Sequence, residues 1–346
     1  MFAQSAIKKQ KIAFSEILAM TPAQMAQGST YTQNAYEYII GKINKMKTPF
    51  IKEQISDMFF NSALTFMKLY DDAEKRKLLR EQFIEKGYLY PGIGLEQFMP
   101  QSKVVPPIWV AAGSGYRGHH AHPGGLVIHI EENLRLSLYL AKMYKEMYGL
   151  SFDKDMIIFS QVAHDLSKAW IANWQPDGSL LLQYGLADTG AHHIFALAES
   201  IYRDIPPQFL YCQAATHVQS TSKSSRDVIT GFLRAAFLVA QKDPQKYGLF
   251  DNMDHLAFDY RREEFWFVNM GDQMLFTVSE LRRCTKVLQE LMATKYGFSE
   301  SDLVGRRFNQ VRNYLFCQCS VAGVFDIIKN KGVKGLQELV EELIEF

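Results

Sequence analysis

The stretch "GHHAHPGGLVIH", residues 118–129, holds four of the nine histidines in a chain of 346 residues. Eight of the nine lie between residues 119 and 217, and only His255 lies outside this region. Imidazole is the commonest metal ligand in proteins and the side chain that titrates nearest to neutral pH. This concentration of histidines indicates a functional site, and the sequence on either side decides how the side chains can meet.

A sharp turn followed by a long helix is predicted at the end of this stretch. The proline and two glycines at 123–125 suit a change of chain direction. The apolar residues that follow have helical spacing over 126–149. The segment "MIIFSQVAHDLSKAWIA", residues 156–172, predicts a second and more apolar helix. His129 and His164 would then lie on two different helices.

Most of the remaining chain has helical periodicity, so the expected fold class is mainly α, a helical bundle with additional N- and C-terminal helices. Further helices are predicted at 49–87, with Gly87 as a stop, and at 189–203, 206–217, 226–242 and 335–346. The segment 88–118 is rich in proline and glycine and is expected to drape over a site. Only "EEFWFVNMGDQMLFTV" favours strands, as a small β-hairpin near 265–278 with its turn around Asn269 to Asp272.

Three parts are expected in the chain: a helical N-terminal extension at 1–107, a histidine-bearing helical core at 108–245 and a C-terminal α+β extension at 246–346. With 47% hydrophobic residues, the chain can bury one large core or two smaller ones. One stripe of the C-terminal helix is predicted to pack in a core, with a partner surface as the alternative. The stripe consists of Leu336, Leu339, Val340, Leu343 and Ile344.

Composition narrows the class of protein. The net charge of +1 gives no general attraction for nucleic acid or an anionic membrane, although a local basic pocket stays open. The N-terminus lacks the apolar core of a signal peptide, and no later stretch suits a membrane span. The cysteines lack the spacing of a disulfide framework, and "CQC" at 317–319 favours buried small side chains over half a metal site. We expect a cytoplasmic protein with no membrane partner.

The pair His164 and Asp165 follows the apolar run "MIIFSQVA" and is expected to be buried. Burying an imidazole and a carboxylate without partners is costly, and a bound cation offsets that cost. A carboxylate can bridge two ions through its two oxygens, while the neighbouring histidine contributes one nitrogen. Ligands that arrive singly from separate helices favour a metal site inside a bundle, with positions open to water and substrate.

Four segments, in this order, resemble the HD-domain metal-dependent phosphohydrolases. "HPGGLVIH" is similar to the "GGLLEH" opening of one branch, which includes HD-type 3′ to 5′ exoribonucleases and HD segments attached to relaxases. "VAHDLSKAW" resembles the "HDIGK" signature, "TGAHHIFALAESI" the family's "GH" helix, and "AATH" its "SHHG" segment. The resemblance covers about residues 108–245 and implies an HD-type helical core.

The resemblance also implies a metal ligand at each matching position. The implied ligands outside the "GH" helix are His129, His164, Asp165 and His217. Asp165 would be the shared carboxylate, and His217 would complete a second metal position. In the "GH" helix, His193 is the better match because the residues after it keep the apolar phasing, and His192 could replace it.

One metal ligand of the family pattern has no matching residue at the aligned position of this sequence. Members close the site with an Asp near the end of a later helix, in a pattern like "ILHYAD", and the corresponding run here is "FLRAAFLVAQKDP". An ungapped comparison puts Ala240 or Gln241 at that place. Asp243 is one turn late, and Asp227 lies well before it. Either the helix register differs, or the metal shell lacks a carboxylate.

Further residues are candidates for catalysis and for substrate contacts. Lys168 matches the Lys of "HDIGK" and would pair with a phosphate oxygen or hold Asp165, with a solvated lysine as the alternative. Asp165 and Lys168 are therefore the candidate catalytic residues. The loop side chains expected to line the substrate entrance, or else to be exposed, are Arg117, His119, His120 and His122.

The predicted function is a metal-dependent phosphohydrolase acting on a nucleotide, a short oligonucleotide or another small phosphate ester. A water whose pKa is lowered by the metal would attack phosphorus, so no protein nucleophile is required. One or two divalent ions are expected, and the ligand types suit Mn, Fe, Ni, Zn or Mg. The alternative is a catalytically degenerate HD domain that acts as a metal- or nucleotide-binding sensor or an assembly module. Homo-oligomerisation stays open.

Overall fold

The computed structural model describes residues 11–100, 104–115, 118–181, 183–258, 261–273 and 276–346. Regular structure in this part of the chain is almost entirely helical, which confirms the mainly α fold class. The first helices are α1 (Phe14–Ala19), α2 (Pro22–Gln27), α3 (Thr30–Ile43), α4 (Pro49–Phe60), α5 (Ala73–Glu85), α6 (Leu95–Phe98) and α7 (Gly125–Tyr148). Two 3-10 turns, η1 (Thr65–Tyr70) and η2 (Ile108–Val110), lie among them.

The second half of the chain continues the helical pattern. Its helices are α8 (Lys154–Ala163), α9 (Lys168–Ile171), α10 (Ala191–Tyr202), α11 (Pro207–Ala214), α12 (Lys223–Ala240), α13 (Glu263–Asp272), α14 (Phe276–Tyr296), α15 (Glu300–Leu303) and α16 (Arg306–Leu343). The α16 backbone leaves the helical conformation at Ser320 and Gly332. The predicted helices at 189–203, 206–217 and 226–242 are therefore confirmed as α10, α11 and α12, with ends shifted by a few residues.

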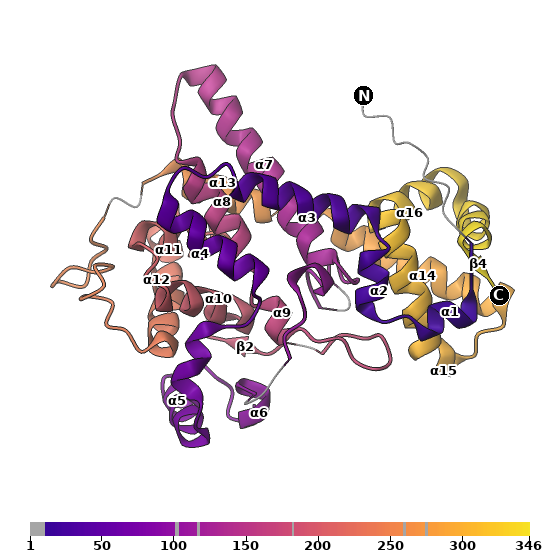
Figure 1. Ribbon diagram of the computed structural model, residues 1–346, viewed down its shortest axis with the longest axis horizontal. Coiled ribbons are helices and arrows are strands. Elements are labelled where there is room, and N and C mark those ends of the chain that lie inside the picture. Colours follow the sequence, from indigo (N-terminus) through magenta and orange to yellow (C-terminus); the bar gives the residue numbers. More distant parts are fainter. Residues whose placement is uncertain (1–10, 101–103, 116–117, 182, 259–260, 274–275) are drawn as a thin grey trace.

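The described strands are two residues long. They are β1 (Ile12–Ala13), β2 (Gly185–Leu186), β3 (Thr189–Gly190) and β4 (Ile344–Glu345). β2 and β3 form a small antiparallel pair just before α10. β1 pairs in parallel with β4, with Ile12 opposite Ile344, so the two ends of the described chain lie side by side (Figure 1).

Two hydrophobic cores hold the helices together. The larger core contains buried side chains from Ala35 to Val268, and the histidine-bearing helices α7, α8, α10 and α11 belong to it. The smaller core joins α1 and α2 to α14 and α16. Leu336, Val340 and Leu343 are fully buried there, which confirms core packing for the C-terminal stripe. Burying each such side chain contributes roughly 1.5–3 kcal/mol.

The start of α7 depends on two glycines, as the "PGG" turn predicts. Gly124 has φ +79°, and a Cβ there would lie 2.2 Å from Thr32 Oγ1. A Cβ on Gly125 would lie 1.9 Å from the carbonyl oxygen of His120. Only glycine fits both places, so the histidine loop folds tightly against the first turn of α7.

Residues Glu263–Asp272 form α13, so the predicted β-hairpin near 265–278 is wrong, and α14 follows where the second strand was expected. Phe265, Phe267 and Val268 are all fully buried, and α13 packs against both α7 and α8. A helix that is buried around most of its circumference lacks the polar face by which helical periodicity is recognised. Its run of aromatic residues is then easily mistaken for strands.

Gly271 lies inside α13, where the hairpin interpretation placed a turn. A Cβ at this position would lie 2.3 Å from Ser137 Oγ on α7 and 2.6 Å from Gln161 Nε2 on α8. Gln161 Nε2 also donates a hydrogen bond to the carbonyl oxygen of Val268 at 2.7 Å. The missing side chain therefore lets α13 approach α7 and α8 closely, and this approach places Asp272 at the end of the helix.

Two predictions from composition can be compared with the structure. The four cysteines are free and buried, in agreement with their interpretation as small core residues. Within the described residues, no helix combines the length and the apolar character that crossing a membrane requires.

Candidate metal centre

Imidazole and carboxylate groups from separate helices meet inside the larger core. They are His129 on α7, His164 and Asp165 in the turn after α8, His192 at the start of α10, His217 after α11 and Asp272 at the end of α13. All are buried except His217, whose side chain is 18% exposed. The structure thus brings together predicted residues that are far apart in sequence.

Asp165 lies between two pairs of histidines. Its Oδ2 atom is 3.1 Å from His129 Nε2 and 3.3 Å from His164 Nε2. Its Oδ1 atom is 3.1 Å from His192 Nε2 and 3.8 Å from His217 Nε2. Each carboxylate oxygen therefore faces a different pair of imidazoles.

Asp272 follows the same division. Its Oδ1 atom is 3.2 Å from His129 Nε2 and 3.4 Å from His164 Nε2, whereas its Oδ2 atom is 3.7 Å from His217 Nε2. The side-chain amide of Asn133, one turn after His129 on α7, donates to Asp272 Oδ1 at 3.1 Å and holds the carboxylate in place. The two aspartates together connect two half-sites.

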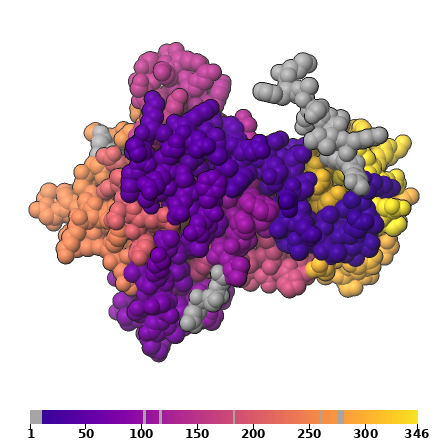
Figure 2. All heavy atoms as spheres, viewed as in Figure 1, coloured from indigo at the N-terminus to yellow at the C-terminus, as the bar shows by residue number. Residues whose placement is uncertain are grey.

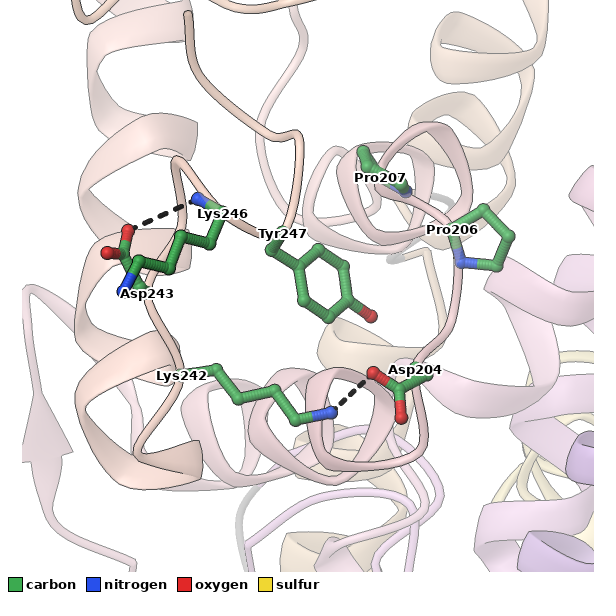
Figure 3. A pocket seen from close by; sticks show the side chains of 7 residues that line it. All are labelled: Asp204, Pro206, Pro207, Lys242, Asp243, Lys246 and Tyr247. Carbon is green, nitrogen blue, oxygen red and sulfur yellow. Dashed lines mark hydrogen bonds and ion pairs between the residues drawn. The ribbon is translucent and has the colours of Figure 1, made fainter. Parts of the chain in front are cut away.

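Asp272 brings a second carboxylate to the cluster, whereas the sequence comparison sought such a carboxylate near the end of α12. The candidates there lie on the surface. Gln241 and Asp243 are exposed just after α12, and Asp227 pairs with Lys223 at 2.9 Å in the first turn of that helix. Figure 3 shows Asp243 at the edge of a surface pocket of about 400 Å³, where its Oδ1 atom accepts from the backbone of Lys246 at 3.3 Å. None of these three side chains lies in the cluster.

Hydrogen bonds on the far side of two imidazoles fix how they face the cluster. His164 Nδ1–H donates to the carbonyl oxygen of Gln161 at 2.9 Å, and His192 Nδ1–H donates to Gln183 Oε1 at 2.5 Å. In the neutral form of each ring, this hydrogen bond leaves Nε2 as the nitrogen with the lone pair, directed at the carboxylates. Partners of this kind orient histidines that bind metals.

Burial and mutual attraction set the charges of the cluster. Burial raises the pKa of Asp165 and of Asp272, but the adjacent histidines outweigh it and hold both well below the usual range. Burial lowers the pKa of His164, but the two aspartates outweigh it and raise that pKa to about 10. Burial lowers the pKa of His217 to about 3 and also lowers that of His192. At neutral pH two carboxylates therefore face the neutral imidazoles of His192 and His217, whereas His164 carries a proton that a bound cation would displace.

The "GH" helix presents His192, and not His193, to Asp165. The ring of His193 lies behind His217, with centroids 4.2 Å apart, and its other neighbour is Phe232 at 5.0 Å. Burial holds the pKa of His193 well below its ordinary value. The structure therefore favours the second choice of the sequence comparison at this position.

Lys168 is 7% exposed and holds Asp165. Its Nζ atom contacts Asp165 Oδ2 and donates to the carbonyl oxygen of Gly113 at 2.6 Å. The alternative of a solvated lysine is therefore wrong. Through Gly113, Lys168 also joins the turn after α8 to the segment that precedes the histidine loop.

The loop histidines differ in position. His119 lies beside the cluster, with its ring centroid 4.6 Å from that of His129. His120 Nε2 lies 3.1 Å from Glu132 Oε2. His122 is 1% exposed and donates to the carbonyl oxygen of Pro123 at 3.1 Å, and its ring neighbour is in α16, so its contacts lead away from the cluster. The predicted contact at Arg117 lies outside the described residues.

The donor set fits a divalent metal. Three of its buried atoms have no hydrogen-bond partner within the described residues: His164 Nε2, His192 Nε2 and Asp165 Oδ1. Ligand atoms that share one ion, with bonds near 2.1 Å, lie roughly 3.0–3.4 Å apart. Five of the seven distances from the aspartates to histidine nitrogens fall between 3.1 and 3.4 Å. Buried His and Asp groups in this arrangement could hold a metal ion.

Comparison with known proteins gives one partial match. The chain is 29% identical over 99 residues to the dihydroneopterin 2′,3′-cyclic phosphate phosphodiesterase of Methanocaldococcus jannaschii. The match covers 29% of this chain and 39% of that protein. No family model matches the chain, and no solved structure matches it. The similarity supports phosphate-ester hydrolysis as the broad class of activity.

Proposed function

We propose that this protein is a metal-dependent phosphohydrolase that cleaves phosphodiester bonds at a two-metal centre. The observation that carries the proposal is the division of Asp165 and Asp272 between two half-sites. One half-site has His129 and His164, and the other has His217 and His192. Paired divalent ions bridged by carboxylates are a common arrangement for phosphoryl chemistry.

The ions would supply Lewis acidity, which lowers the pKa of a water and offsets negative charge on phosphate oxygens. The residues of the chain hold and orient the groups around them. Asp165 bridges the half-sites, Lys168 fixes its Oδ2 atom, and the Gln161 carbonyl accepts from His164 Nδ1–H, so that Nε2 is the nitrogen that would bind a metal once it is deprotonated. His119 lies beside His129 and is placed to contact a substrate oxygen.

A small phosphodiester, such as a cyclic nucleotide or a short oligonucleotide, is the proposed substrate class. The partial similarity to a cyclic phosphate phosphodiesterase supports a diester. The ligand types suit Mn, Fe, Ni, Zn or Mg. The alternative of a degenerate binding module was favoured by the lack of a second carboxylate, and the presence of Asp272 in the cluster supports the enzyme instead.

Hydrolysis of bis(4-nitrophenyl) phosphate and of 2′,3′-cyclic nucleotides tests the proposal. We expect turnover after addition of Mn²⁺, loss of turnover with a chelator, and a decrease of more than roughly 100-fold in Asp165→Asn. His255→Ala is the matched control, because His255 is exposed and lies outside the cluster. Stoichiometric metal binding without turnover of any phosphodiester would instead support the degenerate binding module.

A further inference from the structure

A second concave site lies on the opposite face of α7. Helices α3, α7 and α8 line a groove of about 1070 Å³. Its α7 wall includes Leu138, nine residues after His129. At about 100° per residue, nine residues rotate a side chain by roughly 180° around a helix. The groove is therefore separate from the histidine cluster, which lies on the other side of α7.

The outer half of α7 forms one wall of this groove. Figure 1 shows the end of α7 projecting beyond the other helices, and the N-terminal helix α3 packs against α7. Figure 2 shows this projection as a magenta lobe that stands out from the body of the molecule beside the indigo N-terminal segment. A ligand in the groove would lie against the base of this projection.

Lysines line both sides of the groove. Lys42, Lys45 and Lys47 come from the end of α3 and the loop that follows it. Lys142 and Lys145 face them from α7, and Lys154 lies at the start of α8. All except Lys42 are exposed. The whole chain has a net charge of only +1, so this concentration of positive charge is local.

The two acidic residues of the groove accept hydrogen bonds from backbone N–H groups. Asp155 Oδ2 accepts from the backbone N–H groups of Lys47 and Thr48, at 2.8 and 2.7 Å. Asp153 caps α8 and accepts from the backbone of Met156 at 3.1 Å. Asp155 therefore joins two walls of the groove, Asp153 caps α8, and within the described residues neither carboxylate forms an ion pair with a lysine of the groove.

Glutamates on α7 pair with two of the basic residues. Arg135 pairs with Glu131 at 2.6 Å, and Lys142 lies 3.7 Å from Glu146. Within the described part of the chain, no carboxylate lies within ion-pair distance of the other exposed lysines of the groove. These are Lys45, Lys47, Lys145 and Lys154. Their ammonium groups therefore have no ion-pair partner among the described residues, and they lie along both walls.

Aromatic side chains lie among these cations. The Tyr38 ring is covered by Lys42 and Arg135, which lie 4.7 and 4.0 Å from its centroid. Tyr139 is 62% exposed on the α7 wall. An open aromatic ring among lysines can stack on a base while the ammonium groups contact phosphates. From Arg135 to Lys145, α7 extends about 15 Å, a length that matches roughly two to four phosphates of one strand.

We propose that this groove binds single-stranded nucleic acid, at a site distinct from the metal centre. The concave form favours a strand over a bilayer, because a flat lipid surface would contact only the rim. The exposed Tyr139 ring favours nucleic acid over an acidic peptide, because only the former supplies bases for stacking. This inference goes beyond the proposed hydrolysis, since it involves none of the cluster residues.

Fluorescence anisotropy with a labelled 20-nucleotide poly(U) or poly(dT) strand tests the proposal in the full chain. We expect salt-sensitive binding that weakens at least about tenfold in the Lys45→Glu/Lys145→Glu variant. The slope of log affinity against log salt should decrease by about 0.7 for each lost phosphate contact. Tyr139→Ala should weaken binding with little change in that slope. Hydrolysis of bis(4-nitrophenyl) phosphate should be unchanged in these variants, so the two proposals can fail independently.

The matched control is the Lys329→Glu/Lys331→Glu variant, in which two exposed lysines of α16 are reversed. It changes the net charge by the same amount and should retain binding. The proposal is overturned if the wild type does not bind at low salt, or if the control weakens binding as much as the groove variant. Stronger binding of a polyglutamate peptide or of anionic vesicles than of the oligonucleotide would also overturn it.

Discussion

Asp272 Oδ1 lies 3.2 Å from His129 Nε2 and joins the end of α13 to the first turns of α7. This contact completes a cluster that would otherwise have a single carboxylate for four imidazoles. The position of Asp272 depends on the close packing of α13 against α7 and α8.

Replacing Asp272 by Asn should weaken metal binding by more than roughly 100-fold, because the amide removes a negative charge that faces both half-sites. Calorimetric titration of the apo-protein with Mn²⁺ measures the change. Asp243→Asn is the matched control, since Asp243 is exposed at a surface pocket. Equal affinities in wild type and Asp272→Asn would contradict a ligand role for Asp272.

Gly271→Ala should reduce metal affinity without changing any ligand. The added Cβ would meet Ser137 Oγ at 2.3 Å and force α13 away from α7. Such overpacking costs about 1–3 kcal/mol and should lower the melting temperature as well. In the control Gly231→Ala, the new Cβ has no atom within 4 Å, and stability should be unchanged or higher by up to about 1 kcal/mol. If Gly271→Ala binds Mn²⁺ as tightly as the wild type, close packing of α13 is not what places Asp272.

The two histidines of α10 should differ in metal binding. His192→Ala should lose about one of two bound ions, because His192 Nε2 faces Asp165 Oδ1 at 3.1 Å. His193→Ala should keep both ions, because His193 lies behind His217. Metal analysis of the two variants after dialysis decides between them. The reverse result would favour the assignment based on the family motif alone.

His122 should make the apo-protein less stable in acid. Burial, together with His120, lowers the pKa of His122 from 6.5 to about 3, so the unfolded chain binds the proton more tightly. Above pH 6.5, His122 is neutral in both states and does not destabilise the folded state. As the pH falls from 6.5 toward 3, protonation of the unfolded chain lowers the free energy of unfolding by about 1.4 kcal/mol per pH unit.

The matched variant is His122→Asn, whose amide can still donate to the Pro123 carbonyl but does not titrate in this range. Urea unfolding between pH 7 and 5 should give a steeper loss of unfolding free energy for the wild type than for the variant. Parallel curves would show that His122 is accessible to protons in the folded state.

The sequence predicts much of this cluster because most of its residues lie in short segments that resemble family motifs. His129 comes after a glycine turn at the start of an amphipathic helix, and His164 with Asp165 ends an apolar run. Each pattern depends on a few neighbouring residues, so it can be recognised without knowledge of the tertiary structure. The hydrogen bond of Lys168 to Asp165 also matches one of the two roles suggested by its match to the "HDIGK" signature.

Asp272 could not be found in this way because α13 is buried on nearly all sides. Its aromatic residues favour strands in isolation, and tertiary packing overrides that preference. Glu263 and Glu264 stand in the first turn of α13, where acidic residues favour a helix start, and they were the available signal. The choice between His192 and His193 depends on Gln183, whose contact exists only in the folded chain.

Metal content per chain tests the central claim most directly. Protein purified without chelator or histidine tag should contain about two equivalents of divalent metal by inductively coupled plasma mass spectrometry, as a two-metal site requires. Asp165→Ala should contain almost none, whereas His255→Ala should match the wild type. A wild type that stays empty after addition of manganese, iron, nickel, zinc or magnesium would contradict a metal centre at Asp165 and Asp272.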